Sequence, residues 1–214
     1  MKPIFAATFV TAMAVSTSVF AADAFEGPYM GVGIGPKSQN TKLTDAQGDE
    51  VDGLGKNTFF GKVLGGYSMN FDKFNLGANV FYNIGTTTSK VVTPGGIFNG
   101  SSVEVKWKNQ FGVEFQPGYY LGDSTLGYLK LSWQHMKAEL QINTPSGSAN
   151  PSDSFNGFGV GVGLKHAMDN YVFLWVDFEQ TFFSSKTYST SLSTASIEAK
   201  PKQTLGTFGV GYQF

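Results

Sequence analysis

The stretch Leu205-Gly-Thr-Phe-Gly-Val-Gly-Tyr-Gln-Phe214 decides the fold of this chain. Large apolar side chains occupy every second position in it: Phe208, Val210, Tyr212 and Phe214. This spacing is that of one face of a β-strand. A soluble protein has little reason to carry an aromatic ladder to its last residue, because chain termini usually fray. The stretch therefore favours a strand whose apolar face meets lipid.

Seven further stretches alternate in the same way, which is typical of membrane strands. The longest runs from Val103 to Tyr119, and only Asn109 and Pro117 interrupt its apolar face. Its predicted lipid-facing residues are Val103, Val105, Trp107, Phe111, Val113, Phe115 and Tyr119, and its predicted inward residues are Glu104, Lys106, Lys108, Gln110, Glu114 and Gln116. The other predicted strands are Tyr29–Gly35, Phe59–Met69, Phe74–Ile84, Leu129–His135, Phe158–His166, Tyr171–Phe183 and Gly206–Phe214.

Short and long connections alternate between these eight strands. The short ones are Asn70–Lys73, Leu121–Ser124 and Ala167–Asn170, and the long ones are Pro36–Asn57, Gly85–Ser102, Ala138–Asn156 and Ser184–Gln203. An all-β, antiparallel up-and-down transmembrane barrel needs this order, with turns facing the periplasm and long loops facing outside. A soluble eight-stranded barrel would show the same alternation with its two faces exchanged, so alternation alone leaves that rival open.

The N-terminus has the layout of a secretory signal peptide. Lys2 supplies a positive charge, Ile4 to Phe20 is uncharged, and small residues follow at positions 21–24. The alternative is a transmembrane anchor, but the run is short for a span and several Ser and Thr residues dilute it. We expect residues 1–22 to be a signal peptide, with cleavage within 21–24, and residues 23–214 to form one exported barrel domain.

The composition also favours a barrel. The chain has 27 Gly, 20 Phe, no Cys and only 14% charged residues, with a formal net charge of −1. No window after residue 22 approaches the apolar length of a spanning helix, and the closed β-barrel is the other structure that can cross lipid. The lack of Cys rules out disulfides and thiolate metal sites. No basic stripe gathers on one segment, so we expect no nucleic-acid partner.

The chain resembles the small eight-stranded outer-membrane barrels of the opacity-protein and OmpA-like group. The resemblance lies in Gly157-Phe-Gly-Val-Gly-Val-Gly-Leu164, Tyr128-Leu-Lys-Leu-Ser-Trp133, Tyr171–Gln180 and the last strand, and it covers most of the mature chain. It implies a bacterial outer-membrane location. The terminal Phe214, preceded by apolar residues at alternate positions, is similar to the signal that the barrel assembly machinery reads, which implies this machinery as a partner.

If the apolar faces meet lipid, charged side chains fill the interior. The predicted inward set is Lys62, Lys106, Lys108, Lys130, Lys165, Glu104, Glu114, Asp177 and Glu179. Centring the turn on Asp123 places Glu114 nearly opposite Lys130 as an ion pair. These charges either neutralise one another and plug a narrow lumen or form an ion or proton path, and an eight-stranded interior is just wide enough for side chains to fill.

Inward glycines accompany these charges. They are Gly31, Gly33, Gly35, Gly159, Gly161, Gly163, Gly209 and Gly211. We infer that they make room for the bulky inward residues of the seventh strand, Phe173, Trp175, Asp177 and Glu179. Adaptation to tight barrel curvature is the alternative.

No motif of catalysis or of metal or nucleotide binding is convincing. Gly53–Asn57 partly resembles a P-loop but lacks its spacing. The acidic patch of Asp45, Asp49, Glu50 and Asp52 does not follow the order of a Ca²⁺ loop. His135 and His166 share the phase of the apolar positions, and neither has the Ser two residues later that the lipid A deacylase family uses. We predict no catalytic, cofactor or metal site.

The functional prediction is a structural or surface-interaction protein of the outer membrane. Its long loops would contact host or envelope ligands, and its wall would contact membrane lipid and lipopolysaccharide. A small pore is the alternative, and a lipid A-modifying enzyme is a weaker one.

Overall fold

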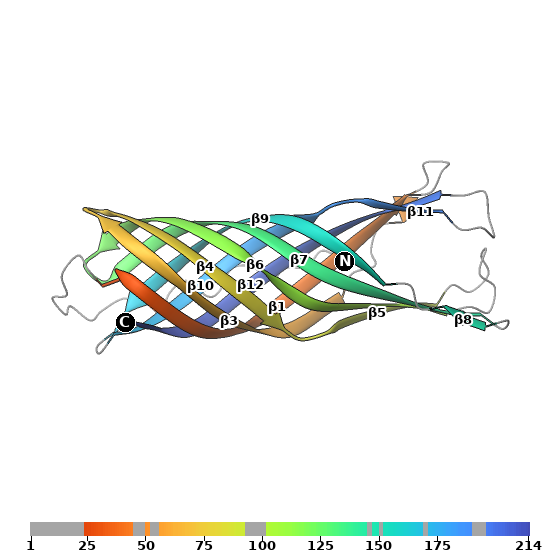
Figure 1. Ribbon diagram of the computed structural model, residues 1–214, viewed down its shortest axis with the longest axis horizontal. Coiled ribbons are helices and arrows are strands. Elements are labelled where there is room, and N and C mark those ends of the chain that lie inside the picture. The colour runs from red at the N-terminus through yellow and green to blue at the C-terminus, as the bar shows by residue number, and fades with distance from the viewer. Residues whose placement is uncertain are drawn as a thin grey trace, which may run out of the picture.

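The computed structural model describes residues 24–44, 50–51, 56–92, 102–144, 147–149, 152–168, 171–189 and 196–214. The strands wind around a common axis as a cylinder (Figure 1). Consecutive long strands are antiparallel neighbours, and the cylinder closes where β12 (Ser196–Gln213) pairs with β1 (Gly27–Thr44). The predicted eight-stranded up-and-down barrel is confirmed. Among the described residues, no helix is long and apolar enough to cross a membrane.

The barrel wall consists of eight long strands. Besides β1 and β12 they are β3 (Lys56–Phe71), β4 (Phe74–Ile84), β6 (Ser102–Gly122), β7 (Thr125–Thr144), β9 (Ser152–Ala167) and β10 (Val172–Phe183). Four short strands extend the hairpins at one end: β2 (Glu50–Val51), β5 (Thr87–Val92), β8 (Gly147–Ala149) and β11 (Lys186–Ser189). In Figure 1, β5, β8 and β11 lie beyond the same end of the cylinder.

The wall strands are longer than the sequence predicted, and parts of the predicted long loops are strand. The register of β1 with β12 continues beyond Pro36, from Lys37 opposite Leu205 to Thr44 opposite Glu198. Backbone hydrogen bonding needs no apolar side chains, so pairing continues into polar sequence where the hydrophobic alternation has ended. The predicted boundaries were wrong for this reason.

The two described short turns lie where they were predicted. One is at Asp72–Lys73 between β3 and β4, and Asp72 has the left-handed φ of 56° that Asp tolerates. The other is at Asp123–Ser124 between β6 and β7. The predicted turn Ala167–Asn170 includes residues 169 and 170, which lie outside the described residues. Both described turns lie at the end of the barrel opposite the extended hairpins.

A bulge in β6 reverses which face of that strand points inward. The register against β7 shifts between Lys108 and Phe111, and Asn109 takes a φ of 52°. One extra residue exchanges the two faces of a strand, because side chains alternate. The side chain of Trp107 is consequently buried inside the barrel, and those of Lys106 and Lys108 lie on the outer side.

Three predictions on this strand were therefore wrong. Trp107 does not face lipid, and Lys106 and Lys108 do not line the lumen. Lys108 instead pairs with Glu139 at 2.8 Å, and both side chains are about 40% exposed. Glu104, Val103 and Val105 lie in β6, but their side chains are outside the described set.

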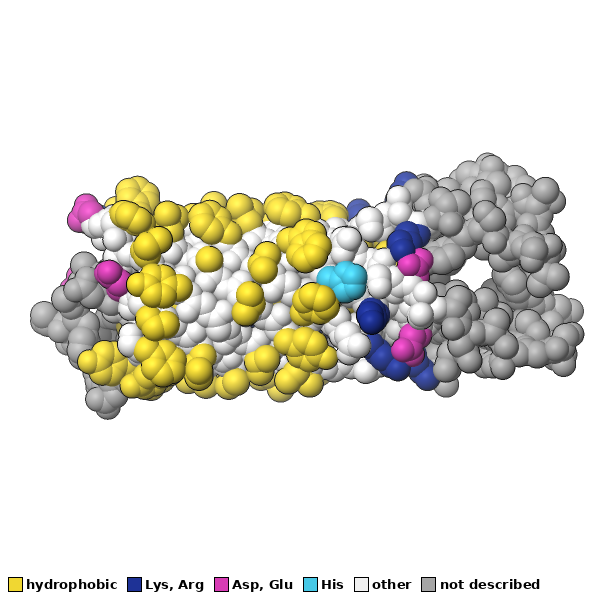
Figure 2. Space-filling model, viewed as in Figure 1, with side chains coloured by type: hydrophobic (Ala, Val, Ile, Leu, Met, Phe, Trp, Pro, Cys, Tyr) yellow, Lys and Arg dark blue, Asp and Glu magenta, His cyan; other side chains and the backbone are white. Residues whose placement is uncertain are grey.

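The rest of the outer surface is apolar in the predicted phase. Two rings of exposed aromatic residues mark its ends, as is typical of barrels at membrane interfaces. The ring at the short-turn end contains Tyr67, Phe71, Phe74, Tyr119, Tyr171, Tyr212 and Phe214, and the ring towards the hairpins contains Phe59, Tyr82, Phe111, Trp133, Phe158 and Phe182. In Figure 2, hydrophobic side chains cover this zone, and Lys and acidic side chains gather beyond it towards the grey residues.

Candidate functional site

The candidate site is the barrel lumen, and β7 crosses all of its layers. From the short-turn end, the inward side chains of β7 are Leu126, Tyr128, Lys130, Ser132, Gln134, Met136 and Ala138, and all are buried. This order runs from apolar through charged and amide groups to apolar again. Each layer is completed by residues from other strands.

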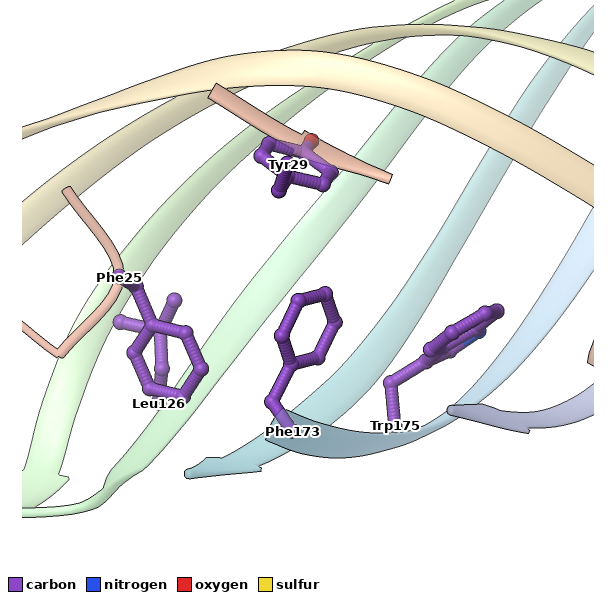
Figure 3. Close-up of a cluster of buried hydrophobic side chains, with 5 residues drawn as sticks. All are labelled: Phe25, Tyr29, Leu126, Phe173 and Trp175. Atoms are coloured by element: carbon purple, nitrogen blue, oxygen red, sulfur yellow. The ribbon is translucent and has the colours of Figure 1, made fainter. Parts of the chain in front are cut away.

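An aromatic cluster fills the short-turn end of the lumen. It consists of Phe25, Tyr29, Leu126, Phe173 and Trp175, all at most 3% exposed (Figure 3). The ring of Phe25 packs edge-on against that of Phe173, with 5.9 Å between centroids. The carbonyl oxygen of Phe25 accepts hydrogen bonds from Ser68 Oγ and from Asn75 Nδ2, the latter at 3.2 Å. The segment before β1 is thereby fixed inside the barrel.

Glycines accommodate the large side chains of β10, as predicted. A Cβ built on Gly31 or Gly33 would approach the Trp175 ring to 2.7 and 2.9 Å, which real Cβ atoms do not do. The same atom on Gly209 would overlap Trp175, and on Gly211 it would overlap Phe173. On β9, Gly159 faces the Glu179 carboxylate. For these positions the prediction that glycine makes room is confirmed.

Two of the inward glycines have a different role. A Cβ on Gly35 would overlap the backbone carbonyl of Gly206, and one on Gly161 would overlap that of Phe178. Here the neighbouring strand itself comes close, which is the curvature alternative of the sequence analysis. Both explanations hold, each for its own positions.

A layer of buried charges lies in the middle of the lumen. The ammonium group of Lys130, on a fully buried side chain, lies 3.1 Å from Glu114 Oε1, 3.1 Å from Asp177 Oδ1 and 2.6 Å from Glu179 Oε2. Lys62 forms a second ion pair with Glu114. The predicted inward positions of Lys62, Lys130, Lys165, Glu114, Asp177 and Glu179 are confirmed. The layer unites residues of β3, β6, β7 and β10.

Lys165 occupies an aromatic environment in the same region. Its ammonium group lies 4.6 Å from the ring centroid of Tyr29, 5.2 Å from that of Tyr128 and 5.8 Å from that of Phe173. It donates a hydrogen bond of 2.8 Å to Gln116 Oε1. Its charge is therefore stabilised by ring faces and an amide oxygen.

An amide network separates the charges from the hairpin end. Gln110 Nε2 donates to Gln134 Oε1 and to Gln203 Oε1, each at 2.6 Å. Gln134 in turn donates to Glu179 and, at 2.9 Å, to Thr181 Oγ1. Gln203 lies on β12, so the network joins β6 to the strand that closes the barrel. These groups satisfy one another's hydrogen bonds inside a buried layer.

A second apolar cluster follows towards the hairpins. It contains Trp107, Met136, Ala138, Phe155 and Phe183. The rings of Trp107 and Phe155 have centroids 5.6 Å apart. At the edge of this cluster the ammonium group of Lys186 lies 5.2 Å from the Phe155 ring and pairs with Asp153.

Sequence reasoning missed several of these lumen residues. Phe25 lies before the first strand, where no alternation marks it. Trp107 was assigned to the wrong face because strict alternation of side chains does not allow for a bulge. Asn109 interrupts the apolar face and was the signal in the sequence that could have indicated the bulge. The amides Gln110 and Gln134 were placed on the polar face, but their contact with Gln203 depends on closure of the barrel.

Both histidines lie on the outer side of the wall, as their phase predicted. His135 Nδ1 is 2.8 Å from Asn156 Oδ1, and the ring of His135 packs on Phe111 at 5.2 Å. His166 Nδ1 is 2.9 Å from Thr125 Oγ1. The described residues contain no group of three or more His, Asp or Glu that could hold a metal ion. Asp45, Asp49 and Asp52 of the acidic patch lie outside the described residues, and Glu50 begins β2.

A closed eight-stranded barrel with an apolar outer belt, aromatic rings at both edges and a polar interior defines the class of transmembrane β-barrels. Residues 7–214 match the family model "Outer membrane protein beta-barrel domain", and the chain belongs to this family. It is therefore a protein of the bacterial outer membrane. No curated protein matches the chain in sequence.

Solved structures of outer-membrane proteins are similar to this one. A major outer membrane protein of Thermus thermophilus is 11% identical, with 86% of this chain and 99% of that chain covered and a TM-score of 0.52. The outer membrane protease OmpT of Escherichia coli is 9% identical over 92% and 99%, also with a TM-score of 0.52. Ail of Yersinia pestis, in complex with the heparin analogue sucrose octasulfate, is 16% identical over 88% and 99%, with a TM-score of 0.42. At these identities the likeness concerns the fold alone.

Proposed function

We propose that this protein is a non-conducting, non-enzymatic barrel of the outer membrane that presents its long hairpins for surface interaction. The observation that carries the proposal is the charge layer around Lys130. This side chain has no exposed surface, and three carboxylates lie within 3.1 Å of its ammonium group. The cation and the three carboxylates bind one another closely across the lumen, and an eight-stranded interior has little further width.

The layers on either side support the same proposal. Aromatic clusters lie at both ends of the charge and amide layers, and Phe25 contributes to one of them from outside the sheet. An ion crossing the lumen would have to displace apolar rings twice and break a buried ion-pair network. Side chains that fill the lumen in this way support a plug rather than a permeation path.

A small pore remains the second candidate, because part of the lumen contains polar atoms that do not hydrogen-bond to one another. The amide group of Gln39 and the Oδ1 atoms of Asn79 and Asn83 are buried and have no hydrogen-bond partner among the described residues. Polar atoms of this kind are what a hydrated path would use.

Planar-bilayer conductance separates the two functions. We expect purified, folded protein to give no stable single-channel steps. A heat-dependent shift on denaturing gels, taken from the same preparation, verifies that the inserted protein is folded, so that an absence of steps cannot reflect failed folding. Reproducible unitary steps from this preparation would overturn the plug.

The surface-interaction part needs its own experiment. Replacing residues 93–101 or 190–195 by Gly-Ser sequence of equal length leaves β5 and β11 intact. We expect at least one exchange to reduce binding of the expressing cells to host cells or to isolated envelope components. The matched control replaces the short turn at 123–124. Unchanged binding in both hairpin exchanges would contradict the interaction role.

Two partners and the processing of the chain belong to the same proposal. We infer that lipopolysaccharide surrounds the outer half of the wall and that the barrel assembly machinery recognises the strand ending at Phe214. The signal peptide should be removed within residues 21–24, which directly precede Phe25 in the sequence. N-terminal sequencing of protein from the outer-membrane fraction tests this.

Absence of catalysis is supported by the histidines, whose described partners are Asn156 and Thr125 rather than carboxylates.

A further inference from the structure

The outer wall of the barrel carries an apolar groove of about 650 Å³. It is lined by Gly65, Gly66, Tyr67, Ala78, Val80, Val113, Phe115, Leu131, Trp133 and Phe158, together with Asn79, Glu114 and Ser132, which line it although their side chains are buried in the lumen. The groove crosses β3, β4, β6, β7 and β9. The large apolar residues among these are exposed, so the groove opens to lipid. In Figure 2, white areas without hydrophobic side chains lie between the hydrophobic side chains of the barrel wall.

The walls of the groove are two adjacent rows of directly paired residues. One row runs Gly65, Val80, Val113, Trp133 and Phe158, and the other runs Tyr67, Ala78, Phe115 and Leu131. The small residues Gly65 and Ala78 leave the β3–β4 end shallow. A Cβ on Gly65 would meet only the carbonyl oxygen of Tyr29, at 3.8 Å. The groove is therefore open because side chains are small there.

The dimensions of the groove select its occupant. Its walls are two residues apart along each strand, which is roughly 7 Å, whereas an α-helix with side chains is about 10 Å wide or more. A helix is thus too broad, and a single alkyl chain fits. Crossing five strands takes roughly 19 Å, and with strands tilted by about 40° this path rises about 12 Å. That rise lies within one leaflet of a hydrocarbon core about 30 Å thick.

The first row continues towards the hairpin end and leads to a cation. Phe158 pairs with Phe182 of β10, and Phe182 pairs with Lys202 of β12. The ammonium group of Lys202 lies 5.7 Å from the Phe182 ring, and the Lys202 side chain is exposed. The row therefore rises towards the hairpin end and reaches a positive charge there. The second row continues to Gln180 and Thr204, a hydrogen-bonded polar pair.

We propose that this groove binds one acyl chain of an anionic lipid, whose head group is held at Lys202. The inference rests on the proposed orientation, in which the extended hairpins face outside and the lipid belongs to the outer leaflet. It does not depend on whether the lumen conducts. Hydrocarbon covers the apolar walls, and the ammonium group attracts the negative charge of the head group.

Tryptophan fluorescence can test this, because Trp133 is the tryptophan that faces lipid. Trp133 is 48% exposed, whereas Trp107 and Trp175 are buried inside the barrel. Folded protein is reconstituted into phosphatidylcholine vesicles that contain a minor fraction of dibrominated phosphatidylglycerol or of dibrominated phosphatidylcholine. Quenching by the bromine atoms then reports which lipid occupies the groove beside Trp133.

We expect the anionic lipid to quench Trp133 as if enriched about fivefold, the effect of one lysine at a membrane surface. Lys202→Gln should abolish the preference, whereas Lys137→Gln, which removes an exposed cation outside the row, should keep it. Gly65→Leu with Ala78→Leu places two large side chains at the shallow β3–β4 end, which closes the groove there, and should also abolish the preference. Val210→Leu, a lipid-facing change on β12, should have no effect.

Three outcomes would overturn the proposal. Quenching of wild-type protein in proportion to mole fraction would show that Trp133 meets only bulk lipid. A preference that survives Lys202→Gln would remove the assigned head-group contact. A dimer detected by sedimentation in detergent that dissociates on filling the groove would identify a second copy as the occupant. None of these results bears on conductance, so failure here is distinct from failure of the plug.

Discussion

Lys130 and Glu114 form an ion pair at 3.1 Å, although Ser132, and not Lys130, is the direct cross-strand partner of Glu114. The contact is diagonal, between positions two residues apart in register. Long side chains on adjacent strands reach such neighbours. The sequence predicted the pair correctly and its register only approximately. It did not predict that Asp177 and Glu179, from two strands further along the wall, would complete the environment of the same cation.

Removing the central cation should destabilise the barrel strongly. Lys130→Met leaves three buried carboxylates without their shared partner, and we expect a loss of about 3–5 kcal/mol in the free energy of unfolding. Urea unfolding of the protein in detergent, followed by tryptophan fluorescence, measures it. Lys108→Met breaks the half-exposed pair with Glu139 and should cost no more than about 1 kcal/mol. Equal losses in the two variants would argue against the importance of the buried layer.

The glycines that face Trp175 should not tolerate a methyl group. Gly209→Ala places a Cβ 2.3 Å from atoms of the indole ring, and overpacking of this kind costs about 1–3 kcal/mol. Gly61→Ala is the control, because a Cβ there meets nothing closer than 3.7 Å. Combining Gly209→Ala with Trp175→Phe should recover part of the loss in a double-mutant cycle. Additive effects would show that the glycine serves curvature instead.

The bulge depends on a residue that accepts a positive φ. Asn109→Val should destabilise the barrel by about 1–2 kcal/mol relative to Asn109→Gly, because a β-branched residue is strained at a φ of 52°. Both variants lose the hydrogen bond from Tyr82 Oη to Asn109, so their difference isolates the backbone term. Urea midpoints of the two proteins provide the measurement. Identical midpoints would mean that the bulge relaxes without cost.

Deleting Phe214 should reduce assembly in the outer membrane. Its backbone N–H donates a 2.9 Å hydrogen bond to the Pro28 carbonyl beside the closing pair of strands, and its ring packs on Tyr212 at 5.0 Å. We expect less folded protein in the outer-membrane fraction than for Phe214→Tyr, which keeps an aromatic ring. Normal amounts of the shortened protein would refute the assembly signal.

The intact barrel should migrate anomalously on denaturing gels when it is not heated. Closure of β1 on β12 leaves no edge of the wall from which detergent can unravel it easily. Heating should convert this form to one with the mobility of the unfolded chain. A single band that ignores heating would be inconsistent with a closed barrel.

The sequence by itself determined the barrel and its strand order. For most strands it also determined which face meets lipid. Period-two alternation, as in Phe208 to Phe214, records a local property, because each side chain's face follows from its position along the strand. The same reasoning placed Lys62, Lys130, Lys165, Glu114, Asp177 and Glu179 inside correctly. It failed at Trp107, since one extra residue at Asn109 exchanges the faces without altering composition.

Only the tertiary structure decided what these inward side chains contact. Gln110 meets Gln203, and Lys130 meets Glu179, because the sheet closes and brings distant strands across a narrow lumen. Closure also places Phe25 against Phe173, and the register of β7 with β9 aligns Trp133 with Phe158 along the outer groove. Such contacts depend on the register and the curvature of all the strands together. A local pattern in the sequence specifies neither.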